Sequence, residues 1–210
     1  WLEFRRVLFR SVSGKLGISG KKAIMNIELE YFYPKEKMEY MKKKAKEKTD
    51  HIIKTVIKDY MSDYEKELAV HDYLVKNSSY DRRLFNGNMP QESYTDYGVL
   101  VKGVGVCEGY AKAMYRILNS IGIETLFVTG QGVGHDGSVE PHAWNIVKID
   151  GEYYQVDVTW DNPLTSNGRK EILHDYFNIT DAKMRKDHRW DDSLYPKCNK
   201  ERYNFKKFVA

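Results

Sequence analysis

Three residues with chemistry of their own follow one another along the chain: Cys107, His142 and Asp157, at steps of 35 and 15 residues. A deprotonated thiol is a nucleophile, and an imidazole can accept and return its proton. A carboxylate can orient the imidazole and stabilise its charged form. Together the three groups could carry out nucleophilic attack through sulfur. Cysteine, histidine and aspartate also have ordinary structural uses. The helices and strands that position the three residues therefore decide between a catalytic and a structural interpretation.

Cys107 stands where the glycine-rich segment 103–106 meets a helix predicted over residues 107–121. The thiol would therefore face free backbone N–H groups and the positive end of the helix dipole. With a basic partner, such a position can lower a thiol pKa from about 8.5 to roughly 3.5–7.5. The same N–H groups could donate to an oxyanion. A small buried side chain is the commonest use of a free cysteine, so this position alone leaves both interpretations open.

The turn Asp150-Gly151 lies between two alternating segments and predicts a hairpin of strands 142–149 and 152–159. In a two-residue register, His142 and Asp157 project from the same face as diagonal neighbours, about 7–8 Å apart at the backbone. A one-residue slip would place them on opposite faces. The hairpin therefore predicts a pairing of the imidazole with the carboxylate.

The other elements follow from hydrophobic periodicity and helix caps. Residues 80–102 predict a long loop, which in a compact domain is usually functional or forms a cleft. The remaining predictions are a strand over 23–32, helices over 34–60 and 63–77 with a cap at Ser62 or Asp63, a strand over 124–129, and an irregular tail with a short strand near 203–209.

The sequence motifs around the three residues resemble the transglutaminase-like superfamily in its bacterial form. These motifs are GVCEGYA around Cys107, HAWN at His142 and VDVTWD around Asp157. The two steps between the residues are also similar to the family's pattern. The resemblance is strong over residues 94–163 and weaker over 68–200, where NSSYD and DYFNIT look like family material. Three motifs in order are far more specific than any one of them.

The resemblance implies an α+β, papain-like fold in which a helix bearing the nucleophile packs on an antiparallel β-sheet, preceded by N-terminal helices. It implies Cys107 as thiolate nucleophile, His142 as general base and acid, and Asp157 as the residue that orients His142. Attack on an amide would give a thioester acyl-enzyme, which water would hydrolyse or an amine would transamidate.

Aromatic residues near the motifs are candidates for the oxyanion site or the cleft walls. Related enzymes place an aromatic or amide side chain upstream of the nucleophile, and Tyr97 and Tyr80 are the candidates here. Trp144 and Trp160 flank the predicted site and would line a cleft that excludes water. Ordinary aromatic packing is the alternative for both tryptophans.

Three segments are expected from the sequence. Residues 1–22 are expected to be a disordered or artefactual segment, and 23–62 to be an extension made of a strand and a basic helix. Residues 63–210 are expected to form the transglutaminase-like catalytic domain. The chain does not begin with Met, so a missing signal sequence says little about the compartment.

Composition excludes several classes of protein. The 210 residues carry a net charge of +4, which is too mild to argue for nucleic-acid binding. No stretch approaches the roughly 18 apolar residues of a transmembrane segment. The glycines near Cys107 make no nucleotide-binding fingerprint. A zinc site using the same three residues lacks a fourth ligand and a close-spaced pair, so neither a metal nor a cofactor is expected.

These observations favour a peptidase or amidase that acts on peptide bonds or Gln side chains. The substrate would be a protein or peptide, cell-wall peptide included. The alternatives are a non-catalytic module on the same fold that binds protein or glycan, and a surface that binds anionic polymers through the lysine-rich residues 35–48. Family members of the bacterial type are often exported, which implies an extracytoplasmic or cell-surface location.

Overall fold

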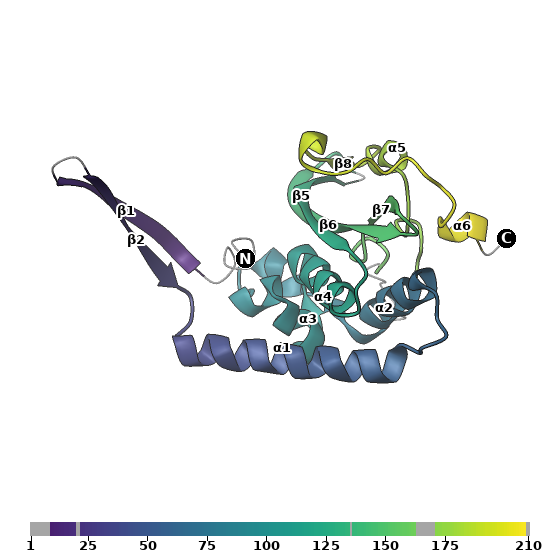
Figure 1. The fold of residues 1–210 in the computed structure, drawn as a ribbon, viewed down its shortest axis with the longest axis horizontal. Coiled ribbons are helices and arrows are strands. Elements are labelled where there is room, and N and C mark those ends of the chain that lie inside the picture. The colour runs from purple at the N-terminus through teal and green to yellow at the C-terminus, as the bar shows by residue number, and fades with distance from the viewer. Residues whose placement is uncertain (1–8, 20–21, 135, 163–170, 209–210) are drawn as a thin grey trace. The chain divides into compact units, whose positions relative to one another are not determined.

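The structure, a computed structural model, describes residues 9–19, 22–134, 136–162 and 171–208. The chain forms two compact units, Trp1–Lys43 and Lys44–Ala210, and each is described by itself. Helix α1 (Lys35–Val56) contributes residues to both (Figure 1).

The first unit contains a two-stranded antiparallel sheet of β1 (Phe9–Ser19) and β2 (Lys22–Tyr31). β2 confirms the strand predicted over 23–32. β1 falls within residues 1–22, which were expected to be a disordered or artefactual segment. The side chains of Ile24, Met25 and Ile27 are exposed.

Helices α1 and α2 (Asp63–Asn77) form where the hydrophobic periodicity of the sequence predicted helices. In the second unit, Ala45 and Ile52 of α1 are fully buried. Helix α2 begins at a capping box, in which the Ser62 hydroxyl accepts from the Glu65 N–H and the Glu65 carboxylate accepts from the Ser62 N–H. The predicted boundaries of α2 are therefore confirmed.

The segment predicted as one long loop, 80–102, is more ordered than expected. It contains 3-10 turns and the helix α3 (Asp96–Lys102), whose N–H groups are capped by Thr95. The prediction of an unbroken loop was wrong because α3 is only two turns long and most of its side chains are buried, so no amphipathic period marks it in the sequence. The short strands β3 (Ser79–Tyr80) and β4 (Val104–Gly105) pair in parallel and lie at the two ends of this segment.

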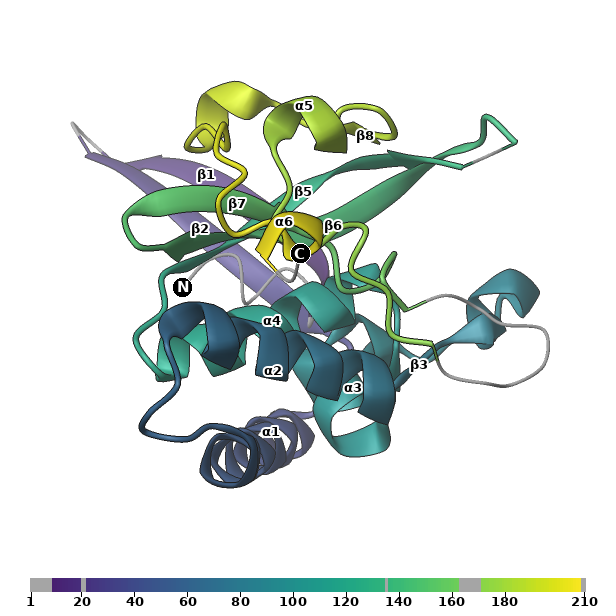
Figure 2. The same ribbon diagram turned by 90° about the vertical axis from the view of Figure 1, so that its right-hand side faces the viewer.

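Helix α4 (Cys107–Ser120) packs on an antiparallel sheet with the strand order β7-β6-β5-β8. Figures 1 and 2 show this sheet between α2, α3 and α4 on one side and the C-terminal segment on the other. Gly109 allows α4 to approach the preceding loop, since a Cβ there would lie 2.6 Å from the Ser93 carbonyl oxygen. The strands are β5 (Thr125–Val133), β6 (Val139–Ile149), β7 (Glu152–Val156) and β8 (His188–Arg189).

The β6–β7 hairpin has the predicted two-residue turn and register. Ile149 pairs with Glu152, and Asp150 and Gly151 both have positive φ, as a type I′ turn requires. The ladder ends at the pair Asn145–Val156, three positions earlier than predicted. The residues that follow Val156 turn away from the strand, and Asp157 is the first of them.

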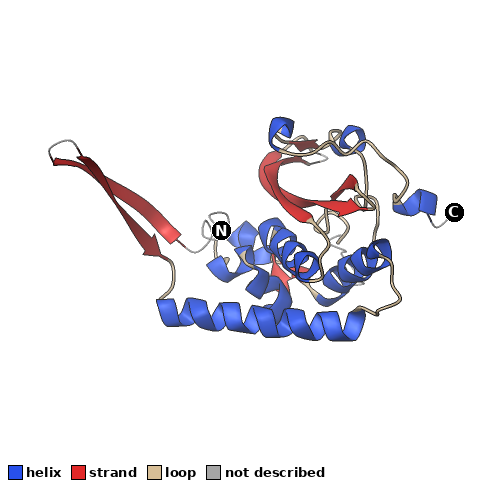
Figure 3. Ribbon diagram, in the orientation of Figure 1, coloured by secondary structure: helices blue, strands red, loops and turns tan. Residues whose placement is uncertain are grey.

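Figure 3 shows helices on both sides of the sheet. Buried side chains fill both of its faces. One core joins the sheet to α2 and α4, and the second lies under the short helix α5 (Asp181–Met184) and the C-terminal segment. The strand predicted near 203–209 was wrong, because the described part of that segment contains a helical turn, α6 (Phe205–Phe208). None of the described helices is long and apolar enough to cross a membrane.

Candidate active site

The thiol of Cys107 lies in the first turn of α4 and is half-buried. The N-cap of this helix is Val106, which makes no side-chain hydrogen bond to the first turn. The first backbone N–H groups of α4 therefore remain available to an anionic group beside Cys107. The parallel β3–β4 pair immediately precedes the helix and fixes its start.

The imidazole of His142 lies between Cys107 and Asp157. Its Nε2 is 2.6 Å from Asp157 Oδ2, and Cys107 lies close enough to the ring to raise its pKa. Since Nε2 faces Asp157, Nδ1 is the nitrogen available to the thiol. The structure therefore brings together the three residues that the sequence predicted, from α4, β6 and the segment after β7.

Burial and charge determine the protonation of this group. Burial would by itself lower the pKa of His142, but Asp157 and Cys107 raise it to about 10. Burial would likewise raise the pKa of Asp157, but His142 and a second histidine, His188, hold it well below its usual range. The Asp157 Oδ1 atom accepts from the backbone N–H groups of Thr159 and Trp160. Asp157 is therefore an ionised, fixed carboxylate, and His142 carries a proton at neutral pH.

His188, on β8, is a residue that the sequence analysis missed. Its Nε2 lies 3.1 Å from the same Asp157 oxygen that faces His142, and its Nδ1 lies 2.7 Å from Asp187 Oδ1. The side chain of His188 is fully buried. No motif marks this histidine, because β8 is two residues long and its position depends on the path of the C-terminal segment.

The region matched in the comparison with protein families includes Cys107, His142 and Asp157. Residues 50–158, just over half of the chain, match the model of the transglutaminase-like superfamily. This chain belongs to that superfamily. The predicted fold is confirmed, with the Cys107-bearing helix packed on the antiparallel sheet that carries His142.

Individual relatives of this transglutaminase-like chain are distant. Kyphoscoliosis peptidase of Homo sapiens is 24% identical over 155 residues, which are 69% of this chain and 23% of that protein. The same peptidase of Mus musculus is 23% identical over 150 residues, covering 66% of this chain and 22% of that one. The chain thus spans less than a quarter of the curated relatives' length. The crystal structure of a TGase, at 15% identity, gives a TM-score of 0.48 over 88% of this chain and 49% of that chain.

The two tyrosine candidates of this transglutaminase-like chain differ in position. Tyr80 pairs with Gly105 across β3 and β4, two residues before Cys107. Burial first, and then the charges of Cys107 and Asp157, raise the pKa of Tyr80. Tyr97 is buried on α3, where its ring contacts Lys102. The contacts favour Tyr80 as the tyrosine beside the thiol.

The two tryptophan candidates also differ. Trp144 is 1% exposed; its ring stacks on His142 and its Nε1–H donates to the Gln155 side chain. Trp160 is half-buried, with its ring 5.5 Å from His142 and 4.3 Å from His188, measured between centroids. Trp144 therefore supports the imidazole from within the core, and Trp160 covers the two histidines.

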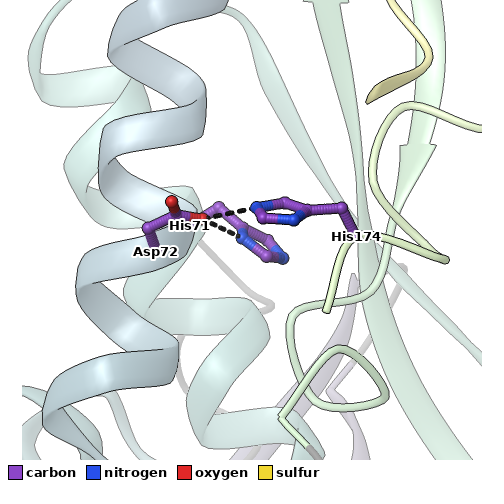
Figure 4. Close-up of side chains that lie close together, drawn as sticks. All are labelled: His71, Asp72 and His174. Carbon is purple, nitrogen blue, oxygen red and sulfur yellow. Dashed lines mark hydrogen bonds and ion pairs between the residues drawn. The ribbon is translucent and has the colours of Figure 1, made fainter. Parts of the chain in front are cut away.

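A second group of histidine and aspartate side chains is connected through Asp161 to the segment that begins at Asp157. Asp72 Oδ1 is 3.0 Å from His71 Nδ1 and 2.8 Å from His174 Nε2 (Figure 4). His71 Nε2 is 3.2 Å from Asp161 Oδ2. Burial would lower the pKa of His71, but Asp161 and Asp72 raise it to about 9. Burial would raise the pKa of Asp72, but the two histidines lower it to about 2. The sequence analysis assigned no role to this group.

Proposed function

We propose that this chain is a thiol acyl-transfer enzyme that cleaves or transamidates amide bonds, with Cys107 as nucleophile. In this proposal His142 is the general base and acid, and Asp157 orients it. The observation that carries the proposal is the 2.6 Å pairing of His142 with the buried Asp157 beside Cys107, which is near enough to raise the pKa of His142. Membership of the transglutaminase-like superfamily supports the same chemistry.

The first half of the reaction would form a thioester. His142 holds a proton at neutral pH, which favours a thiolate–imidazolium pair with Cys107. The thiolate attacks the amide carbonyl carbon and forms a C–S bond. When the C–N bond then breaks, His142 donates its proton to the departing nitrogen. The released product is an amine, and the acyl group stays on Cys107.

The second half would release the acyl group. Neutral His142 removes a proton from water or from an amine as that molecule attacks the thioester. The C–S bond breaks, the sulfur leaves as thiolate, and His142 keeps the proton. Water gives a carboxylic acid and an amine gives a new amide. We propose hydrolysis of a protein or peptide, cell-wall peptide included, as the main reaction.

The negative charge on the substrate oxygen needs hydrogen-bond donors. The uncapped N–H groups at the start of α4 supply them beside Cys107, and the Tyr80 hydroxyl is the side-chain donor that we propose. The raised pKa of Tyr80 keeps its hydroxyl protonated at neutral pH, so the group can donate. Trp160 excludes water from the histidine side of the site.

The direct test is to trap the acyl-enzyme. The protein is incubated with a panel of Gln-containing, linear and cell-wall-type peptides, with and without a primary amine, and intact mass is recorded. The account predicts an acyl adduct on Cys107 and an acid product, which becomes the amide when the amine is added. Cys198, the other cysteine, is fully buried. The Cys198→Ala variant is therefore the matched control and should keep the adduct.

Two outcomes would overturn the proposal. Turnover by the Cys107→Ala variant would show that another group is the nucleophile. A thiol that acylates with none of the peptides, and that reacts no faster than an ordinary cysteine, would favour a non-catalytic module that binds protein or glycan. Binding of the same peptides without turnover would then identify its ligand class.

A further inference from the structure

The His71–Asp72–His174 cluster brings three potential metal-ligand atoms together from distant parts of the sequence. His71 and Asp72 are neighbours on α2, and His174 comes from the segment after residue 170 (Figure 4). His71 Nδ1, Asp72 Oδ1 and His174 Nε2 all lie within 4.8 Å of one another. A tetrahedral zinc ion with bonds of about 2.0–2.2 Å holds its ligand atoms roughly 3.3–3.6 Å apart. The cluster is therefore already close to the size of a zinc site.

The environment of His71 is that of a metal-ligating histidine. Such histidines almost always donate their second ring N–H to a carboxylate or carbonyl, which fixes the ring and raises its basicity. His71 Nε2 meets Asp161 Oδ2 at 3.2 Å, and both side chains are fully buried. Asp161 is itself fixed, because its other oxygen accepts the Tyr176 backbone N–H. This second carboxylate is independent of the three potential ligands.

The opposite side of the cluster reaches the protein surface. The Asp72 side chain is 37% exposed and that of His174 is 13% exposed, so an ion has a route of entry. Two imidazoles and a carboxylate suit zinc and similar transition metals, whereas calcium and magnesium prefer oxygen ligands. Asp72 and Asp161 supply two negative charges, which equal the charge of a divalent ion.

We propose that His71, Asp72 and His174 bind one divalent transition-metal ion, zinc in the first instance, with solvent as the fourth ligand. The ion replaces the protons that bridge Asp72 to the two histidines, and those protons are released on binding. The site goes beyond the proposed acyl transfer, and its ligands are separate from Cys107, His142 and Asp157. It would connect α2 to the segment that carries His174, next to the residues Asp157–Asp161.

The test is a calorimetric titration of untagged Cys107→Ala protein with zinc chloride near neutral pH. This parent lacks the active-site thiol, which would otherwise compete for the metal. The proposal predicts one ion per chain. His174→Gln and Asp72→Asn should each reduce the affinity at least tenfold, and Asp161→Asn should reduce it by about 10–100-fold, as expected for a carboxylate behind a ligand. Zinc should also raise the Tm of the parent more than that of His174→Gln.

Two controls separate this site from other histidines. His188→Gln alters the His142–Asp157–His188 cluster, which also groups three potential ligands, and should leave zinc affinity unchanged. His51→Gln changes an exposed histidine on α1 and should also leave zinc affinity unchanged. The proposal is overturned if the parent binds no zinc, if His174→Gln and Asp72→Asn bind it as tightly as the parent, or if His188→Gln abolishes binding. Circular dichroism establishes that each variant is folded.

Discussion

Two clusters in this molecule share one arrangement, in which a single carboxylate oxygen faces two imidazoles. In the first, Asp157 Oδ2 meets His142 and His188 at 2.6 and 3.1 Å. In the second, Asp72 Oδ1 meets His71 and His174 at 3.0 and 2.8 Å. The pKa of one histidine in each is raised, to about 10 for His142 and about 9 for His71.

The clusters differ in the second neighbour that raises the pKa of the principal histidine. For His142 this neighbour is Cys107, and for His71 it is the carboxylate of Asp161, which faces the ring's other nitrogen. A thiol can be activated by proton transfer, whereas a second carboxylate only stabilises the positive charge. In the proposed mechanism, the nucleophile is what separates the two histidine–aspartate clusters in function. Asp157 is also far more buried than Asp72, at 1% against 37% exposed side chain.

The largest effect is expected from Cys107→Ala. If the thiol alone separates the two clusters in function, removing it should lower turnover by more than about 10³-fold while leaving the fold intact. Product formation and the acyl adduct, measured by mass spectrometry, test this expectation. Turnover near that of the unchanged protein would show that the Cys107 thiol does not separate the two clusters in function.

The two bridging carboxylates give the next comparison. Asp157→Asn keeps the size of the side chain but removes the charge that orients His142, so kcat should fall by about 10²–10⁴-fold. Asp72→Asn makes the same change in the other cluster and should cost less than about tenfold. Steady-state kinetics of the two variants, side by side, measures the difference. Equal losses would mean that both clusters support the reaction to the same degree.

A smaller loss is expected from His188→Gln. Asp157 would keep its contact with His142 and its two backbone donors, so the active-site carboxylate loses only its hydrogen bond with His188. That loss corresponds to about 1.5 kcal/mol, or roughly tenfold in kcat. The optimum pH should stay in place. A loss as large as that of Asp157→Asn would instead give His188 a direct part in the reaction.

The smallest effect is expected in the pH dependence of the free energy of unfolding. The folded state raises the pKa of His142 from the ordinary 6.5 to about 10, so it binds this proton more tightly than the unfolded state does. The resulting stabilisation is complete below pH 6.5 and is lost as the pH rises towards about 10. Urea unfolding should show the advantage of the unchanged protein over His142→Gln shrinking across that range. A constant difference would contradict the raised pKa.

Local signals in the sequence were sufficient to predict the elements that carry Cys107 and the first histidine of each cluster. The Asp150-Gly151 turn determines the register of β6 and β7, and the capping box at Ser62 determines the start of α2. The glycine-rich segment before Cys107 marks the start of α4. These signals depend on residues close together in the chain, so periodicity and turn chemistry are enough to find them.

The second histidine of each cluster could not be predicted in the same way. His188 and His174 come from the C-terminal segment, where the described elements are short and the contacts are long-range. The choice between Tyr80 and Tyr97 likewise depended on the two-residue β3–β4 pair. Helix α3 was missed for a related reason, since tertiary burial rather than an amphipathic period defines it.

The central claim is that His142 activates the thiol of Cys107, and the rate of alkylation by iodoacetamide against pH tests it most directly. Mass spectrometry reads each cysteine separately, and the buried Cys198 serves as the unreactive reference. The account predicts that Cys107 reacts with a midpoint well below the pH of about 8.5 that is typical of a free thiol, and that His142→Ala moves the midpoint back towards that value. A midpoint near 8.5 in both proteins would contradict the account.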